Sequence, residues 1–136
     1  MRAVLQRVLR ASVTVDGALI GAIEGGLLVY LGIAPDDAEA EVEWFARKVS
    51  EMRIFEGVGD REGQMDRAVG EAGGAVLVVS QFTLYADTRK AAAPRSSPQP
   101  HPRSPRHSSS GAWTRSVLAA CASRAAASGR TCWYTR

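Results

Sequence analysis

A polar and aromatic segment directly follows the apolar run 75–79: Ser80, Gln81, Phe82 and Thr83. The run has the composition of a buried strand, and a strand that turns polar at its end commonly presents hydroxyls and backbone N–H groups at a pocket edge. Such donors can stabilise the oxyanion that forms when an ester is hydrolysed. This segment is therefore the first candidate for a site.

Thr83 carries the hydroxyl best suited to act as a nucleophile, but a threonine hydroxyl needs an adjacent base to activate it. Residues 1–90 contain neither His nor Cys, which excludes nucleophilic catalysis by those residues and the usual zinc sites in this part of the chain. We therefore expect Thr83 to position the substrate while water attacks. A second interpretation is that Ser80, Gln81 and Thr83 only form the solvent-facing side of a strand.

The composition changes abruptly after Lys90. Residues 1–90 contain 10 Lys and Arg against 14 Asp and Glu, a net charge of −4, whereas residues 91–136 contain seven Arg and no acid, a net charge of +7. Both Cys, both His and five of the six Pro lie in the second segment. We therefore predict a domain at 1–90 and a low-complexity tail, rich in Arg, Ser, Pro and Ala, at 91–136.

Strands are indicated by the apolar pattern of the first segment. Two β-type runs flank Asp16-Gly17, which predicts a β-hairpin. The continuous apolar run 27–33 predicts a central strand buried on both faces. Residues 53–55 predict a further strand, and residues 75–85 predict the last strand. The Gly- and acid-rich stretch 56–63 predicts a loop or the tip of a hairpin.

A helix is predicted after Pro35, with Asp36 as its N-terminal cap. Its apolar face consists of five residues spaced four and three apart: Ala38, Val42, Phe45, Val49 and Met52. Antiparallel strands around one or two helices indicate an α+β domain with a curved sheet or a partial β-barrel. The longest apolar run, 117–122, is far shorter than the roughly 20 residues of a membrane span, so we expect a cytoplasmic protein.

Six sequence blocks in residues 1–90 occur in the order and spacing of one enzyme family: MRAVLQRV at 1–8, ASVTVDG at 11–17, GLLV at 26–29, LGI at 31–33, RIF at 53–55 and SQFTL at 80–84. Together they resemble the D-aminoacyl-tRNA deacylases of the D-tyrosyl-tRNA deacylase type. The SQFTL block is one of the two signature motifs of that family, which makes the resemblance specific.

The resemblance implies a cytoplasmic homodimer that needs neither a metal nor a cofactor and does not associate with membranes. Such an enzyme hydrolyses the ester that joins a D-amino acid, or glycine mischarged on tRNA-Ala, to the 3′-terminal adenosine of tRNA, and it releases the free amino acid and the tRNA. By the same resemblance Gln81 and Thr83 are catalytic, with the tRNA 2′-hydroxyl assisting. Ser80, Gln81, Phe82 and Arg7 bind the aminoacyl-adenosine.

The tail departs from the family pattern. The second family motif is a Gly-Pro dipeptide with a cis bond, which reaches into the partner's pocket and excludes L-amino acids, and this chain contains no Gly-Pro. Translated one base earlier, however, the codons for 91–96 can encode Gly-Arg-Arg-Pro-Ser-Phe, and those for 126–134 can encode Gly-Arg-Phe-Gly-Ala-Asp-Met-Leu-Val. Both strings resemble the family. We therefore interpret 91–136 as a frameshift product, with no strand beyond Lys90 and no functional pairing of Cys121 with Cys132.

Two other functions stay open. One is a non-catalytic RNA-binding module whose tail arginines contact phosphates, although no aromatic residue lies between Arg95 and Arg106 to stack on bases. The other is an inactive truncated relic of a deacylase. Turnover of D-Tyr-tRNA but not of L-Tyr-tRNA would support the enzyme. Salt-sensitive binding of tRNA without turnover would support the RNA-binding module, and the absence of both effects would support the relic.

Overall fold

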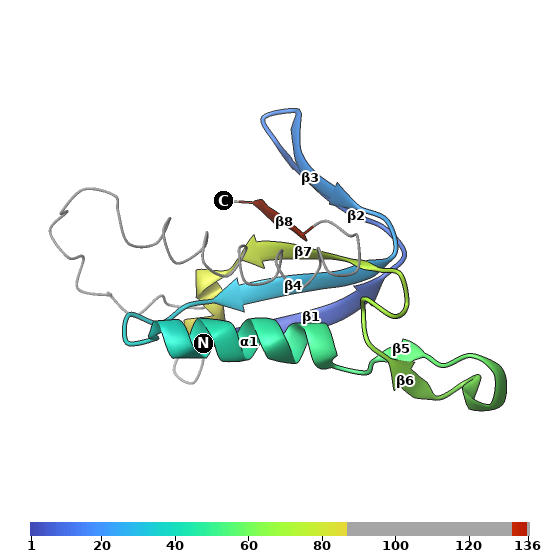
Figure 1. Ribbon diagram of the computed structural model, residues 1–136. Coiled ribbons are helices and arrows are strands. Elements are labelled where there is room, and N and C mark those ends of the chain that lie inside the picture. The colour runs from blue at the N-terminus through green and yellow to red at the C-terminus, as the bar shows by residue number, and fades with distance from the viewer. Residues whose placement is uncertain (87–131, 136) are drawn as a thin grey trace, which may run out of the picture.

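The computed structural model describes residues 1–86 and 132–135, which form an α+β structure built on one mixed sheet (Figure 1). The order of strands in the sheet is β1-β4-β7-β8, with β1 antiparallel to β4 and the other neighbours parallel. These strands are β1 (Arg2–Val8), β4 (Gly26–Gly32), β7 (Ala75–Ser80) and β8 (Cys132–Thr135). The α+β prediction is confirmed.

The apolar run 27–33 is the centre of this sheet, as predicted. β4 pairs with β1 along one side and with β7 along the other. On one face Leu27, Val29 and Leu31 are buried, whereas Leu28 and Tyr30 on the other face are half-buried. The strand is thus protected on both faces, and the deeper core lies on the side of the first three residues.

One helix, α1 (Glu39–Glu51), covers that face of the sheet (Figure 1). Three residues of its predicted apolar face, Val42, Phe45 and Val49, are buried and join the core formed by β4 and β7. Ala38 is exposed and Met52 half-buried, so the buried face is shorter at both ends than the sequence pattern indicated, and it also includes Ala46. No helix in the described parts of the chain is long and apolar enough to cross a membrane.

The predicted cap of this helix is wrong. The helix begins at Glu39, and its N-cap is Ala38, so Asp36 lies too far from the first turn to accept a bond from it. The carboxylate of Glu41 supplies the missing contact, because its Oε2 accepts a hydrogen bond from the Ala38 N–H at 2.9 Å. A glutamate at this third helical position often closes the first turn in this way.

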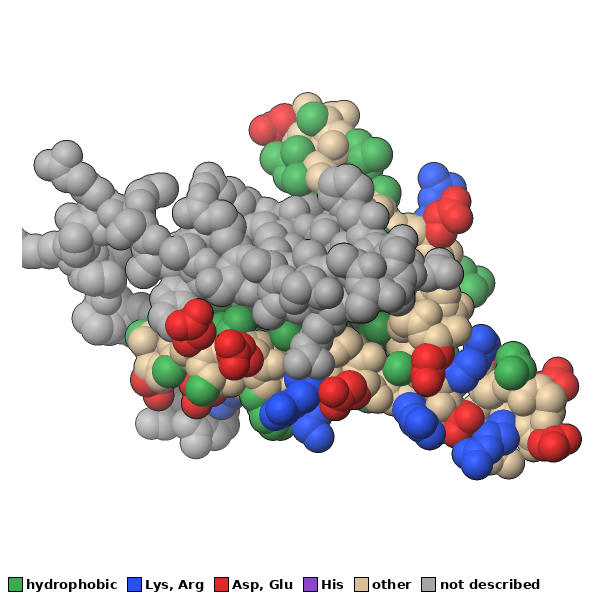
Figure 2. Space-filling model, viewed as in Figure 1, with side chains coloured by type: hydrophobic (Ala, Val, Ile, Leu, Met, Phe, Trp, Pro, Cys, Tyr) green, Lys and Arg blue, Asp and Glu red, His purple; other side chains and the backbone are tan. Residues whose placement is uncertain are grey.

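The Asp16-Gly17 hairpin is confirmed, with β2 (Ala11–Val15) antiparallel to β3 (Ala18–Ile23). Asp16 has φ 50° and Gly17 φ 80°. Two positive φ angles are what a two-residue hairpin turn that follows the strand twist requires. The hairpin projects from the body, and Figure 2 shows hydrophobic side chains gathered on it. The exposed ones include Val15, Leu19 and Ile20.

A second hairpin follows the helix, and it consists of β5 (Phe55–Glu56) and β6 (Met65–Arg67) with a 3-10 turn, η1 (Gly59–Arg61), between them. The sequence predicts a strand at 53–55, but the observed strand begins at Phe55 and continues to Glu56. Asp66 accepts from the Arg61 guanidinium at 2.7 Å and lies 3.6 Å from that of Arg53. Both arginine side chains are well exposed, so these ion pairs add little stability.

The predicted strand 75–85 ends early. β7 stops at Ser80, and a 3-10 helix, η2 (Phe82–Tyr85), follows. The Gln81 N–H makes a last ladder bond to the Leu31 carbonyl at 2.8 Å, and the Leu84 N–H then turns back to the Gln81 carbonyl at 3.3 Å. Once the chain bonds to itself, β pairing cannot continue.

The prediction of no strand beyond Lys90 is also wrong at one place. Residues 132–135 form β8, parallel to β7, with Cys132 opposite Val76 and Thr135 opposite Val79. A strand edge offers unpaired N–H and C=O groups to any extended segment, so this pairing does not require a particular sequence. The remainder of the predicted tail, including Cys121, lies outside the described residues.

Candidate active site

The polar segment lies at the carboxyl end of β7, where the strand passes into η2. Ser80 is the last residue of the strand, stands opposite Leu31 of β4 and is exposed. Phe82 leaves 75% of its surface exposed, and Thr83 beside it is exposed as well. An exposed aromatic ring can stack on a nucleobase. The segment is therefore accessible to a large substrate.

Gln81 and Thr83 form the polar centre of this segment. The side-chain amide of Gln81 donates a hydrogen bond through Nε2 to Oγ1 of Thr83. An amide N–H cannot remove the proton of the hydroxyl, so the contact does not activate Thr83 as a nucleophile. Because the oxygen accepts from Gln81, the hydroxyl proton of Thr83 is left to donate to a substrate oxygen.

Two backbone donors lie beside this hydroxyl. The N–H groups of Phe82 and Thr83 have no acceptor in the described parts of the chain. The first N–H groups of any helix lack intrahelical partners, and the sharp turn after Gln81 leaves these two in that position. Two N–H groups and one hydroxyl in adjacent residues are donors of the kind that can stabilise an oxyanion.

Contacts from the start of the sheet hold this turn in place. The Arg2 guanidinium donates through NH1 to the Leu84 carbonyl at 3.0 Å, and it lies 4.7 Å from the centroid of the Tyr85 ring. Gly32 at the end of β4 lets the turn pack closely, since a Cβ there would lie 3.1 Å from the Gln81 carbonyl oxygen. Sequence reasoning did not identify Arg2 or Tyr85, because no local pattern links residues 83 positions apart.

A buried ion pair lies next to the same turn. The Asp37 carboxylate accepts from the Met1 ammonium at 2.5 Å through Oδ1 and from the Ala34 N–H at 2.6 Å through Oδ2. Burial alone would raise the pKa of Asp37, but these hydrogen bonds and the ammonium charge outweigh it, so the pKa is lowered. Burial, and then the negative charge of Asp37, raise the pKa of Tyr85.

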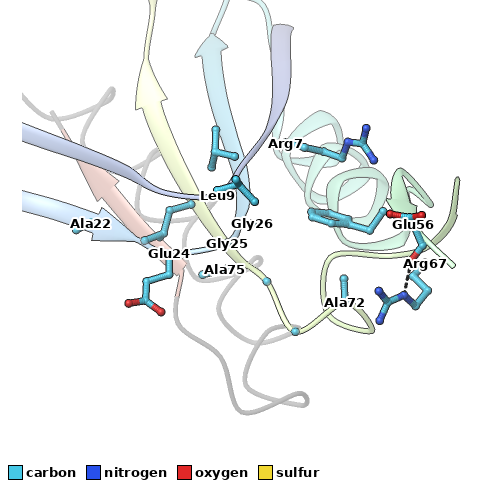
Figure 3. Close-up of a pocket in the computed structure, with 15 residues that line it drawn as sticks. Arg7, Leu9, Ala22, Glu24, Gly25, Gly26, Glu56, Arg67, Ala72 and Ala75 are labelled. Atoms are coloured by element: carbon cyan, nitrogen blue, oxygen red, sulfur yellow. Dashed lines mark hydrogen bonds between the residues drawn. The ribbon is translucent and has the colours of Figure 1, made fainter. Parts of the chain in front are cut away.

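An open cleft of about 840 Å³ lies at the opposite end of the sheet, where β4 and β7 begin. Figure 3 shows its charged lining residues, Arg7, Glu24, Glu56 and Arg67. Arg67 donates through Nε to the Glu56 carbonyl at 2.6 Å, and the Glu56 carboxylate accepts from the Gly63 N–H at 2.9 Å. These two residues therefore stabilise the β5–β6 hairpin, and none of residues 80–83 lines the cleft.

The described structure does not bring Arg7 together with the polar segment. Arg7 stands opposite Leu27 in the ladder of β1 and β4, whereas Ser80 stands opposite Leu31. Four residues of extended strand separate these levels by roughly 13 Å. A site role for Arg7 stays a prediction. In the described residues no group of three His, Cys, Asp or Glu side chains is arranged to hold a metal ion.

A family model described as "D-Tyr-tRNA(Tyr) deacylase" matches residues 4–124. The chain belongs to the D-Tyr-tRNA(Tyr) deacylase family. The resemblance noted in residues 1–90 is thereby confirmed, and the match of this family extends into the segment interpreted as a tail.

Curated relatives support membership of the deacylase family. A D-aminoacyl-tRNA deacylase of Opitutus terrae is 61% identical over 94 residues, which are 69% of this chain and 61% of the relative. The corresponding protein of Koribacter versatilis is 57% identical over the same shares of the two chains. This chain thus spans about three fifths of the length of these relatives.

Solved structures agree with the deacylase fold. The structure titled "c-Myc DNA Unwinding Element Binding Protein" is 30% identical, with a TM-score of 0.76 over 99% of this chain and 85% of the other. A probable eukaryotic D-amino acid tRNA deacylase is 13% identical, with a TM-score of 0.63 over 91% of this chain and 68% of the other. The second likeness supports the fold alone.

Proposed function

We propose that this protein is a D-aminoacyl-tRNA deacylase, which hydrolyses the ester between a D-amino acid and the 3′-terminal adenosine of tRNA. The observation that carries the proposal is the donor set at the end of β7, formed by the Thr83 hydroxyl and the N–H groups of Phe82 and Thr83. Membership of the deacylase family gives this donor set its substrate class.

We infer a reaction in which these donors stabilise the negative charge. Water adds to the acyl carbon, and the negative charge that develops on the carbonyl oxygen is stabilised by the N–H groups and the Thr83 hydroxyl. Gln81 keeps this hydroxyl oriented through its side-chain amide. The bond from the acyl carbon to the ribose oxygen then breaks, and the proton lost by the attacking water passes to that oxygen, assisted by the neighbouring 2′-hydroxyl. The products are a free D-amino acid and tRNA.

The same proposal assigns binding roles around the reacting ester. Phe82, exposed at the surface, stacks on the terminal adenine, and Ser80 contacts the substrate from the end of β7. Arg7, at the other end of β1, contacts a more distant part of the substrate. Glycine mischarged on tRNA-Ala is a second substrate, since glycine offers no side chain for a chiral site to exclude.

We further propose that the enzyme acts in the cytoplasm as a homodimer without metal or cofactor, as the family resemblance implies. The exposed apolar side chains of the β2–β3 hairpin, Val15, Leu19 and Ile20, support an association of this kind, because such a patch is stabilised when a partner covers it. The molar mass in solution, measured by light scattering, tests the dimer.

We also propose that residues 91–136 are the product of a shifted reading frame. Two findings support it: the curated relatives align with only 94 residues of the chain, and composition and charge change after Lys90. The family model, by contrast, matches beyond this junction, to residue 124. Sequencing of the coding DNA across this junction, together with the intact mass of the protein, tests it. An unshifted frame without family-like strings in the alternative frame would rule it out.

The test of the activity is deacylation of D-Tyr-tRNA and L-Tyr-tRNA by the full chain and by a version with the restored frame. Hydrolysis of the D-form only supports the proposal. Salt-sensitive binding of tRNA without turnover would instead support an RNA-binding module. If neither version hydrolyses or binds the tRNA, the chain is an inactive relic. The neighbour titled as a DNA-binding protein does not favour DNA here, because residues 1–90 carry a net charge of −4.

A further inference from the structure

The turn that carries Thr83 has few contacts of its own. Among the described residues, one backbone–backbone bond joins it to the sheet, from the Gln81 N–H to the Leu31 carbonyl at 2.8 Å. Two more bonds close it, from the Leu84 N–H to the Gln81 carbonyl at 3.3 Å and from the Ala86 N–H to the Thr83 carbonyl at 2.9 Å. A single turn of 3-10 helix is marginal by itself, so neighbouring side chains must set its position.

Arg2 supplies that contact from the first residue of β1. Its NH1 donates to the Leu84 carbonyl at 3.0 Å, and the last carbonyls of a helix have no partner within the helix. The guanidinium also lies over the Tyr85 ring, with 4.7 Å between its central carbon and the ring centroid. A planar cation can stack and donate at the same time, which fixes both the carbonyl and the ring.

Gly32 completes the arrangement. It stands directly opposite Arg2 in the ladder of β1 and β4. A Cβ on Gly32 would lie 3.2 Å from Cβ of Leu84 and 3.2 Å from Cδ2 of Tyr85, so the turn rests closely on this glycine. Arg2 and Gly32 are paired across β1 and β4, and both contact the turn: Arg2 donates a hydrogen bond to it, and Gly32 packs closely against it.

We propose that Arg2 is a positioning residue for the donor set of Thr83, with Tyr85 as the ring on which it stacks. The inference rests on the proposed deacylase function. Arg2 contacts no reacting atom in this account, and it acts by keeping η2, and with it the Phe82 and Thr83 donors, in place. Because the contact is exposed, its loss changes the geometry of the turn more than the free energy of unfolding.

The experiment compares Arg2→Ala, Arg2→Lys and Tyr85→Ala in the full chain, with D-Tyr-tRNA as substrate. We expect Arg2→Ala to lower kcat roughly tenfold or more, with KM nearly unchanged, because donors that are misplaced by a fraction of an ångström stabilise the transition state less. Arg2→Lys recovers part of the activity, since an ammonium can still donate to the Leu84 carbonyl. Tyr85→Ala lowers kcat as well, and the double variant loses less than the product of the two single losses.

A matched control is Arg10→Ala, an exposed arginine that lies two residues beyond the end of the same strand. It should keep the kcat and the melting temperature of the wild type. The positioning role is overturned if Arg2→Ala keeps the wild-type kcat, or if its loss of activity matches the fraction of unfolded protein in the assay.

Hydrogen exchange separates this inference from the proposed function. The amides of Leu84 and Ala86 close the turn, so their exchange should accelerate in Arg2→Ala while the amides of α1 stay protected. Faster exchange in Arg2→Ala, together with a wild-type chain that hydrolyses no D-Tyr-tRNA, would overturn the deacylase function and leave the structural contact standing. Unchanged exchange at both amides would overturn the role of Arg2 whether or not the chain is active.

Discussion

The Gln81 side-chain amide donates to the Thr83 hydroxyl from two residues away, across the point where β7 turns into η2. The direction of this bond decides the chemistry of the segment. Thr83 accepts from Gln81 and therefore has a hydroxyl proton to donate, which suits the stabilisation of an oxyanion and not nucleophilic attack.

Replacing Thr83 tests whether its hydroxyl donates in the transition state. We expect Thr83→Val to lower kcat roughly 100-fold, the effect of removing one oxyanion donor, and Thr83→Ser to stay within several-fold of the wild type. The residue is exposed, so melting temperatures should hardly change. Steady-state kinetics on D-Tyr-tRNA measures both variants, and equal losses in Val and Ser variants would contradict the donor role.

Gln81→Glu tests the direction of the hydrogen bond. A carboxylate has no N–H to donate, so the Thr83 hydroxyl must turn and donate to it, and no proton is left for the substrate. We expect Gln81→Glu to be less active than Gln81→Ala, although it is closer in shape to glutamine. Single-turnover rates at saturating enzyme make the comparison, and a more active Glu variant would show that the amide has another role.

Asp37 should make the stability of the protein fall in acid. Its folded pKa lies below the ordinary value of 3.8, so its contribution is complete above that value and is lost as the pH falls through the lowered folded pKa. We expect Asp37→Asn to cost about 1–3 kcal/mol near neutral pH, because the buried Met1 ammonium loses its charged partner. The difference from the wild type should shrink as the pH falls below 3.8 and through the lowered folded pKa of Asp37.

Urea unfolding at neutral and acid pH measures this effect. The exposed neighbour Asp36 provides the control, since Asp36→Asn should leave the unfolding midpoint unchanged near neutral pH. If Asp37→Asn cost as much in strong acid as at neutral pH, the ion pair with Met1 would not be the source of its stabilisation.

Gly32→Ala should disturb the turn without unfolding the sheet. The new Cβ would lie 3.1 Å from the Gln81 carbonyl oxygen, tighter than ordinary contact, and the small displacement needed falls on η2. We expect about 1 kcal/mol of destabilisation and a larger relative loss of kcat. Gly25→Ala is the matched control, because nothing lies within 4 Å of a Cβ at that position. Equal activities of the two variants would argue against the importance of the close packing at Gly32.

Local patterns in the sequence were sufficient to predict the α+β fold, the hairpin at Asp16-Gly17 and the buried positions Val42, Phe45 and Val49. They succeed because a two-residue turn with positive φ and a helical apolar spacing are set by neighbours in the chain. The order of the SQFTL block and its companions likewise indicated the family, since that information is written in the sequence alone.

Only the tertiary structure decided where the last strand ends and what holds the site. Ser80 closes β7 because Gln81 bonds to Leu31 and the chain then turns back, which the apolar run up to Tyr85 did not reveal. The charged partner of Asp37 depends in the same way on a distant segment, since it is the Met1 ammonium, 36 residues away. Arg2 reaches Leu84 across 82 residues. Contacts of this kind form only when the sheet places distant segments side by side, so no window along the sequence contains them.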